Sequence, residues 1–352
     1  MPEQPLFLAA AAAWLPPPTE LAALAGGGAD EFVTNGIVSV PVAGADDAPP
    51  QMAARAAQTA LTRAAAQLRR DDVVLVLYAN TYHQGQNSFW SPASYVQRSA
   101  GVSGAAAINV GQASNGGMAA LDLAAGYLSA RGSGAALITA ADRFCEPGIV
   151  RWAADYGAVY GDGAAAVVLS TSGGFARVLS VHTSTDAELE QMHRGNTRFQ
   201  PAPTGAPVDV RLSKVQFITD FGLDNLLHRL STGMRAVVGA ALARAGCDLA
   251  DMAVVVLPNL NRKMLTDQYL EPLALDPDRT LVAWSSRVGH LGAADQLAGV
   301  AHLVEAGRVA RGDRVLLVGT GSGLSWSAAV LEILDVPDWA EQTASPAPVP
   351  VG

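Results

Sequence analysis

Two stretches of the chain, one in each half, repeat a pattern of glycines, small residues and leucines. GMAALDLAAGYLSARGSG covers 117–134 and GAADQLAGVAHLVEAGRVARGD covers 292–313. Similar distances separate Asp72 from Ser114 (42 residues) and Asp251 from His290 (39 residues). Strands that alternate with helices twice over predict an α/β protein of duplicated halves, with mixed sheets sandwiched by helices and a pseudo-twofold axis. Equivalent turns of such halves face each other, so we expect Ser114 and His290 to be neighbours.

Hydrophobic runs and periodicities place the remaining elements. In the first half we expect strands at 6–15, 37–42, 73–77, 105–110, 134–140 and 159–169 and helices at 51–68 and 93–99. In the second half we expect helices at 233–245, 263–269 and 293–306 and strands at 253–257, 280–284 and 314–318. Weak periodicity over 170–227 predicts an extended loop region that covers one end of the site. The predicted division is 1–170, 171–337 and a disordered, proline-bearing tail at 338–352.

Composition excludes several kinds of partner. Half of the residues are hydrophobic, 16% are charged, the net charge is -9 and no Lys/Arg-rich run occurs, so we expect no nucleic-acid partner. Apolar stretches are too short or too interrupted to cross a bilayer. The run at 6–15 is not typical of a signal peptide, because no basic segment precedes it and prolines follow it, so we interpret it as a buried strand. Cys145 and Cys247 are too few for a disulfide framework and lack metal-ligand neighbours. We therefore expect a cytoplasmic protein without a metal or other cofactor.

The stretch INVGQASNGGMAALDLAAGYL at 108–128 indicates a strand, a small-residue turn and a helix. Ser114 lies in that turn, before a helix N-terminus whose N–H groups and dipole favour a developing anion. This placement suits a nucleophile. The simpler interpretation is that Ser114 only caps the following helix.

Five motifs in a fixed order carry a family resemblance. They are GQASNGG before a helix, YGDGAAAVVL, VLPN, VGHLGAAD and LLVGTGSGLSWSAAV. Over about residues 5–335 the chain resembles β-ketoacyl-acyl carrier protein synthase III, within the thiolase superfamily. The resemblance implies a thiolase-like fold and an acyl thioester substrate, carried by an acyl-carrier protein or by coenzyme A. The aromatic and basic residues that gate coenzyme A in these synthases have no clear counterpart at 36–42.

Departures from the family pattern fall on the positions that carry its chemistry. Ser114 replaces the nucleophilic Cys, Asn259 stands where the family has its catalytic His, and His290 stands where it has an Asn. An Asp follows at Asp295, five residues after His290. This set is similar to serine-bearing members that handle starter units in aromatic polyketide pathways, such as the daunorubicin starter-unit enzyme. The resemblance therefore implies an antibiotic or related secondary pathway.

The residues themselves suggest how such a site would work. A serine hydroxyl needs a general base, which His290 can be, and Asp295 can hold the other ring nitrogen if His290 lies in the turn before the helix. Asn259 is expected to donate to a substrate carbonyl, and the N–H groups of Ser114 and Ser322 to form an oxyanion hole. Each assignment has a simpler alternative. His290 would only cap a helix, and Asp295 would be a solvated acid in the first turn of its helix. Asn259 would only hold its loop, and residues 321–323 would form a plain β-turn.

Two further histidines and the activity itself stay open at this point. His193, in QMHRGNTRF, reads as a surface loop residue, a second acid/base or part of a basic docking patch, and His83 is equally ambiguous. The preferred function is an acyltransferase with an acyl-serine intermediate. A decarboxylative condensing enzyme and an inactive partner subunit are the alternatives. Low charge density predicts a homodimer whose interface uses the strand at 105–110.

Overall fold

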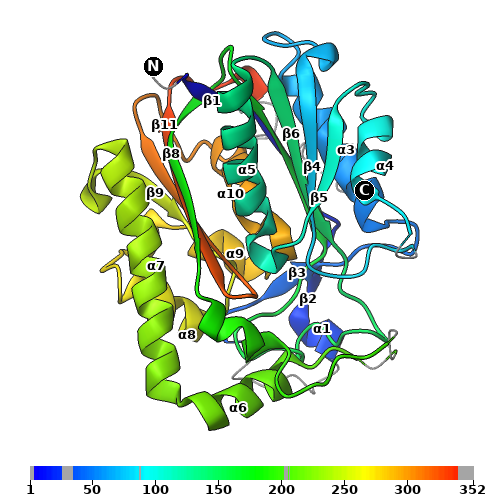
Figure 1. The fold of residues 1–352 in the computed structure, drawn as a ribbon, viewed down its shortest axis with the longest axis vertical. Helices are drawn as coiled ribbons and strands as arrows, with labels where there is room; N and C mark the ends of the chain where they lie inside the picture. The colour runs from blue at the N-terminus through cyan, green and yellow to red at the C-terminus, as the bar shows by residue number, and fades with distance from the viewer. Residues whose placement is uncertain (1–3, 26–34, 87–88, 202–204, 206, 340–352) are drawn as a thin grey trace, which may run out of the picture.

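A computed structural model describes residues 4–25, 35–86, 89–201, 205 and 207–339 (Figure 1). Nine strands form one sheet in the order β5-β4-β6-β7-β1-β8-β11-β10-β9, and β2 pairs with β3 beside it. The strands are β1 (Leu6–Trp14), β2 (Pro18–Glu20), β3 (Ser39–Pro41), β4 (Val73–Ala79), β5 (Ala106–Val110), β6 (Ala135–Asp142), β7 (Gly163–Ser170), β8 (Ala176–Thr185), β9 (Met252–Val256), β10 (Arg314–Gly321) and β11 (Ser325–Ile333). The helices are α1 (Leu21–Ala25), α3 (Pro49–Arg63), α4 (Pro92–Ser99), α5 (Gly116–Arg131), α6 (Val210–Phe221), α7 (Leu223–Ala245), α8 (Arg262–Leu265), α9 (Val282–Val288) and α10 (Asp295–Glu305).

The sheet is mixed, and its strand order is nearly symmetric about the contact between β1 and β8. β4 runs parallel to β5 and β6, β9 runs parallel to β10, and the remaining pairings are antiparallel. In Figure 1, α5 and α10 lie between the two leaves of the sheet, α3 and α4 cover the outer face of one leaf, and α7 covers the other. The α/β fold of mixed sheet and sandwiching helices is therefore as predicted. The division at residue 170 stays a prediction.

Burial explains why the central helices are so rich in small residues. α5 packs against strands of both leaves and against α10, and its buried positions include Met118, Leu121, Ala125 and Leu128. Alanine and glycine let the two helices pack closely between the leaves, although α5 keeps one exposed face that carries Leu123 and Tyr127. The buried strand predicted at 6–15 is also found, as β1. No helix among the described ranges is long and apolar enough to cross a membrane.

The prediction of a strand at 280–284 is wrong. Thr280 forms a single parallel bridge to Val255 at the edge of the sheet, and the chain then turns into α9. α9 packs against β3, with the Val38 N–H donating to the Ser286 carbonyl at 2.7 Å. A short apolar run is compatible with a strand or with a buried helix, and here packing against β3 favours the helix.

The extended loop predicted over 170–227 is only partly found. The segment contains the ten-residue strand β8, the 3-10 helix Ala187–His193 and the whole of α6. Sequence periodicity was weak because β8 and α6 each bury few side chains, which blurs the alternation of apolar and polar residues. The segment does cover the site, as described below. Of the tail predicted to be disordered, residues 340–352 lie outside the described part of the chain.

Candidate active site

Ser114 lies in the 3-10 turn Ala113–Asn115 that joins β5 to α5. The preceding Ala113 has φ 45°, a left-handed conformation that alanine rarely adopts and that marks sharp strand-to-helix turns presenting a nucleophile. The helix cap is Asn115, whereas the Ser114 hydroxyl points toward His290. Ser114 therefore does not serve as the N-cap of α5.

Glycines bring the turns of Ser114 and His290 together. A Cβ on Gly117 would lie 2.4 Å from the carbonyl oxygen of Ala293, so the residue must be glycine for the two turns to touch. Gly292 has φ 62°, and a Cβ there would lie 2.2 Å from Asp142 Oδ2. The predicted meeting of Ser114 and His290 is confirmed by this packing.

The backbone of His290 is fixed by the first half of the chain. Its N–H donates to the Val159 carbonyl at 2.8 Å, and its own carbonyl accepts from the Gly161 N–H at 3.0 Å. Asp162 holds this segment, because its buried carboxylate pairs with Arg151 and accepts from backbone N–H groups. The YGDG motif thus acts as a platform for the histidine turn.

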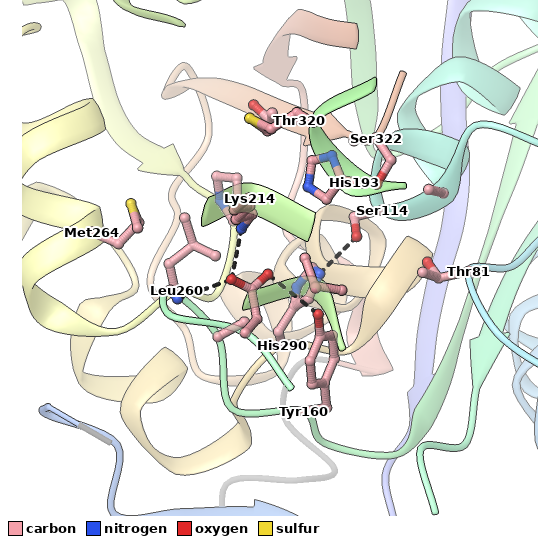
Figure 2. Close-up of a pocket in the computed structure, with 18 of the residues that line it drawn as sticks. Thr81, Ser114, Tyr160, His193, Lys214, Leu260, Met264, His290, Thr320 and Ser322 are labelled. Carbon is pink, nitrogen blue, oxygen red and sulfur yellow. Dashed lines mark hydrogen bonds and ion pairs between the residues drawn. The ribbon is translucent and has the colours of Figure 1, made fainter. Parts of the chain in front are cut away.

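Three side chains form a continuous hydrogen-bonded chain. Ser114 Oγ lies 2.7 Å from His290 Nε2, and His290 Nδ1 lies 2.6 Å from Asp295 Oδ2. Asp295 accepts only, so we assign the proton to Nδ1, which leaves the Nε2 lone pair facing the serine hydroxyl. Figure 2 shows the His290 ring directed at Ser114. The arrangement matches a nucleophile, a base and a group that orients the base.

The pKa of His290 follows from its surroundings. Burial alone would lower it, but the charge of Asp295 and the hydrogen bond to that carboxylate outweigh burial, so the net pKa is raised above the usual 6.5. A raised pKa makes the imidazole a better proton acceptor from a hydroxyl.

Asn259 is placed differently from the expectation that it donates to a substrate carbonyl. Its Nδ2 donates to Asp295 Oδ1 at 3.0 Å, its backbone N–H donates to Asp295 Oδ2 at 2.8 Å, and its Oδ1 accepts from Ser285. The side chain is buried and is not among the residues that line the cavity. Asn259 is therefore placed to orient the carboxylate. This contact could not be predicted from the sequence, because it depends on how the loop after β9 folds back onto α10.

Ser322 and Ser114 both line the cavity, and both are labelled in Figure 2. A Cβ on Gly321 would lie 2.5 Å from the Asn115 nitrogen and from the Gln112 carbonyl oxygen, so glycine permits this close approach. The oxyanion hole formed by the N–H groups of Ser114 and Ser322 remains a prediction that this placement allows.

A cavity of about 400 Å³ opens in front of Ser114 and His290. Most of its wall is apolar. Among the apolar side chains are Phe144, Ile149, Met192, Val208, Leu230, Leu260, Met264 and Leu324. His193 lines the same cavity and is not a residue of an open surface loop, whereas His83 is exposed and does not line it.

Among the polar residues of the wall that were not predicted from the sequence are Asp155, Tyr160 and Lys214. Lys214 Nζ donates to Asp155 Oδ1 at 2.6 Å. Burial alone would raise the pKa of Asp155, but Lys214 lowers it overall. Lys214 was missed because it belongs to the segment interpreted as loop, and a DYG tripeptide in the sequence carries no signal of its own.

Asp142, at the end of β6, is another missed residue. It is fully buried and accepts from the backbone N–H groups of Thr81, Tyr82 and Ala293. Burial raises its pKa to about 7, although these N–H groups lower it in part. Asp142 thereby ties the loop after β4 to the turn before α10. Within the described ranges, no group of three or more His, Cys, Asp or Glu residues could hold a metal ion.

Comparisons with known proteins agree with this fold. The family model of 3-oxoacyl-[acyl-carrier-protein] synthase III matches residues 108–187, and the model of its C-terminal part matches 242–333. β-Ketoacyl-[acyl-carrier-protein] synthase III 2 of Streptomyces coelicolor is 30% identical over 277 residues, covering 77% of each chain. The synthase III of Rhodospirillum centenum is 29% identical, covering 86% of this chain and 90% of the relative. The chain belongs to the β-ketoacyl-acyl carrier protein synthase III family.

Solved structures extend the likeness. The structure of ChlB3, described as an acyltransferase, is 33% identical with a TM-score of 0.89, covering 95% of this chain and 99% of that one. The synthase III of Aquifex aeolicus, 22% identical with a TM-score of 0.75, covers 93% and 99% and shares the fold. The thiolase-like fold class predicted from the sequence is confirmed.

Proposed function

We propose that the protein is an acyltransferase that works through an acyl-serine intermediate. Ser114 takes an acyl group from a thioester of an acyl-carrier protein or of coenzyme A and passes it to a carrier thiol, a hydroxyl or an amine. The observation that carries this proposal is the unbroken chain from Ser114 through His290 to Asp295. The polyketide setting implied by the resemblance is part of the same proposal.

Both half-reactions use the same base. As Ser114 Oγ bonds to the acyl carbon, its proton moves to His290 Nε2, and the N–H groups of Ser114 and Ser322 stabilise the oxyanion. The C–S bond then breaks, and the proton on Nε2 passes to the departing thiolate. In the second half an acceptor gives its proton to Nε2 while it attacks the acyl ester, and Ser114 regains a proton as it leaves.

The runner-up function, decarboxylative condensation, is supported by the names of the curated relatives, which are synthases. Its support within the site is weaker, because a His and an Asn would together have to polarise a malonyl thioester, and Asn259 instead bonds Asp295 away from the cavity. An ester on serine is also a poorer electrophile for a carbanion than a thioester on cysteine. The ChlB3 likeness favours acyl transfer.

The test is acylation of Ser114 followed by intact-mass spectrometry. The purified protein is mixed with a panel of acyl-CoA and acyl-carrier thioesters, and we expect a mass increase equal to one acyl group, mapped to Ser114. Ser114→Ala must abolish it. The other measurement is carbon dioxide release from malonyl thioesters. Acylation of Ser114 followed by carbon dioxide release favours condensation, acylation without release favours acyl transfer, and neither signal favours the inactive partner subunit.

A further inference from the structure

A polar cluster formed by His193, Lys214, Asp155 and Tyr160 lines the same cavity as Ser114. His193 ends the 3-10 helix Ala187–His193, Lys214 lies on α6, and the other two precede β7. Figure 2 shows His193 and Lys214 directed into the cavity that also holds Ser114 and His290. None of the four belongs to the proposed Ser–His–Asp chain.

The segments that carry the cluster are tied together. The N–H groups of Val210 and Arg211, at the start of α6, donate to the Ala154 carbonyl at 2.9 and 3.1 Å. Asp155, the next residue, then receives Lys214 from the following turn of α6. The Tyr160 hydroxyl donates to the other oxygen of Asp155 at 3.5 Å. These bonds give Lys214 and Asp155 defined positions in the wall.

Stability alone does not explain an ion pair at this place. The Lys214 and Asp155 side chains are 18% and 9% exposed, and the wall around them is mostly apolar. Desolvation of two charges offsets most of their attraction, so an apolar pair of similar volume would be about as stable. A cavity meant only for an alkyl chain would also gain from apolar residues here.

His193 adds an unsatisfied polar group. Its Nδ1 is buried and has no hydrogen-bond partner in the structure. Burial, followed by the nearby charge of Lys214, lowers its pKa to about 3, while Asp155 opposes this shift. The ring is therefore neutral at physiological pH and offers one donor nitrogen and one acceptor nitrogen. A buried polar atom without a partner in a ligand cavity indicates a group supplied by the ligand.

We infer that this cluster is a specificity subsite for an acyl group bearing a neutral hydroxyl. The inference rests on the proposed acyl transfer and names the acyl class it would use. A hydroxyl accepts from the Lys214 ammonium, which holds two protons beyond the one given to Asp155, and also donates to His193 or Asp155. A carboxylate is disfavoured, because Asp155 already neutralises Lys214, the only Lys or Arg among the described residues of the wall.

The experiment compares acylation of Ser114 by a set of N-acetylcysteamine thioesters. The acyl groups are hexanoate, the four isomeric hydroxyhexanoates that carry the hydroxyl at carbon 3, 4, 5 or 6, and adipate. We expect at least one hydroxy isomer to exceed hexanoate by ~10- to 100-fold in kcat/KM, the range for a hydrogen bond to buried or charged groups. Adipate should be the poorest substrate. Equal rates for hexanoate and every hydroxy isomer, or a preference for adipate, would overturn the inference.

Variants locate the preference. His193→Phe and the double variant Lys214→Met with Asp155→Asn, which leaves no lone buried charge, should each lower the ratio of hydroxyhexanoyl to hexanoyl rates toward one. The matched control is His228→Phe on the exposed side of α7, which should keep the wild-type ratio. A ratio unchanged in both cluster variants places the preference elsewhere and overturns the assignment. If a variant fails to fold, the wild-type rates with the thioester series still test whether the subsite prefers a hydroxyl.

A binding measurement separates this inference from the proposed function. Calorimetric titration of Ser114→Ala with the same thioesters reports recognition without acylation. If no thioester acylates the wild type but Ser114→Ala still prefers a hydroxy isomer, acyl transfer is wrong and the subsite stands. If acylation occurs and neither rate nor binding distinguishes the isomers, the subsite is wrong and acyl transfer stands.

Discussion

Replacing Asp295 by Asn probes the assembled site most directly, because four donors converge on this carboxylate. Oδ2 accepts from His290 Nδ1 and from the Asn259 N–H, and Oδ1 accepts from the Leu291 N–H and from Asn259 Nδ2. An amide has only one accepting oxygen. In either orientation its NH₂ group therefore faces two donors.

The two orientations have different costs, and both impair the base. If the NH₂ faces His290, the ring must move its proton to Nε2, and no lone pair is left for the Ser114 hydroxyl. If the NH₂ faces Leu291 and Asn259, two N–H groups lose their acceptor in a buried site. We expect acylation to slow by ~10³- to 10⁴-fold, comparable to the loss when the Asp of a Ser–His–Asp site is changed to Asn. Each tenfold loss of rate corresponds to an increase of about 1.4 kcal/mol in the activation free energy.

The assay is single-turnover acylation followed by intact mass from pH 5.5 to 9. For the wild type the rate should rise with pH through an inflection above 6.5, because the pKa of His290 is raised and only the neutral ring accepts a proton. In Asp295→Asn the inflection should move to lower pH, since the acid that raises this pKa is gone. His290→Ala should lose at least ~10²-fold and show no such inflection.

The control is Asp224→Asn, an exposed acid at the start of α7, which should leave rate and inflection unchanged. If Asp295→Asn kept the wild-type rate within about threefold and the same inflection, the carboxylate would not orient the base. His193 would then become the base to test, and its pKa near 3 would give no inflection above pH 6.

Three further predictions follow from the same geometry. Ser114→Cys should still form an acyl-enzyme and gain condensing activity, measured as carbon dioxide release, because a thioester is the better electrophile; unchanged release would count against this. Asn259→Ala should slow acylation by ~10-fold, since the backbone N–H of residue 259 still holds Asp295, and its effect should nearly vanish in an Asp295→Asn background; full additivity would mean that Asn259 acts independently. β5 is an edge strand that exposes Ile108, so sedimentation should show a homodimer that Ile108→Lys weakens, whereas a dilution-stable monomer would contradict it.

Most of the fold could be predicted because its signals are local. The long buried strand β4 is a continuous apolar run, and α3 has a clear helical pattern with its apolar residues on one face. The error at 280–284 arose where the signal was short and tertiary packing decided, since only Thr280 bridges to the sheet before α9 begins. α6 was missed because it buries only Phe217, so no apolar stripe marks it.

The same division between local and distant information applies to the site. Ser114 and His290 could be paired from the sequence because the duplication relates their turns, and Asp295 is close to His290 along the chain. Asn259 was expected to face a substrate carbonyl and instead donates to Asp295, because its side-chain direction depends on a loop that packs against α10. Lys214 and Asp155 meet across 59 positions of sequence without a motif, so only the folded chain reveals the pair.

The departures from the family pattern form one coupled change in the structure. A serine needs a stronger base than a cysteine does, which accounts for His290 in hydrogen-bond contact with Ser114. A histidine base needs a fixed tautomer, which accounts for Asp295 at the first residue of α10. A buried carboxylate needs donors on both oxygens, and Asn259 gives one to each, from its backbone and its side chain. Under the proposed acyl transfer, the exchange of His and Asn between the two turns is the change that a serine nucleophile would require, since each new residue satisfies a requirement created by the one before it.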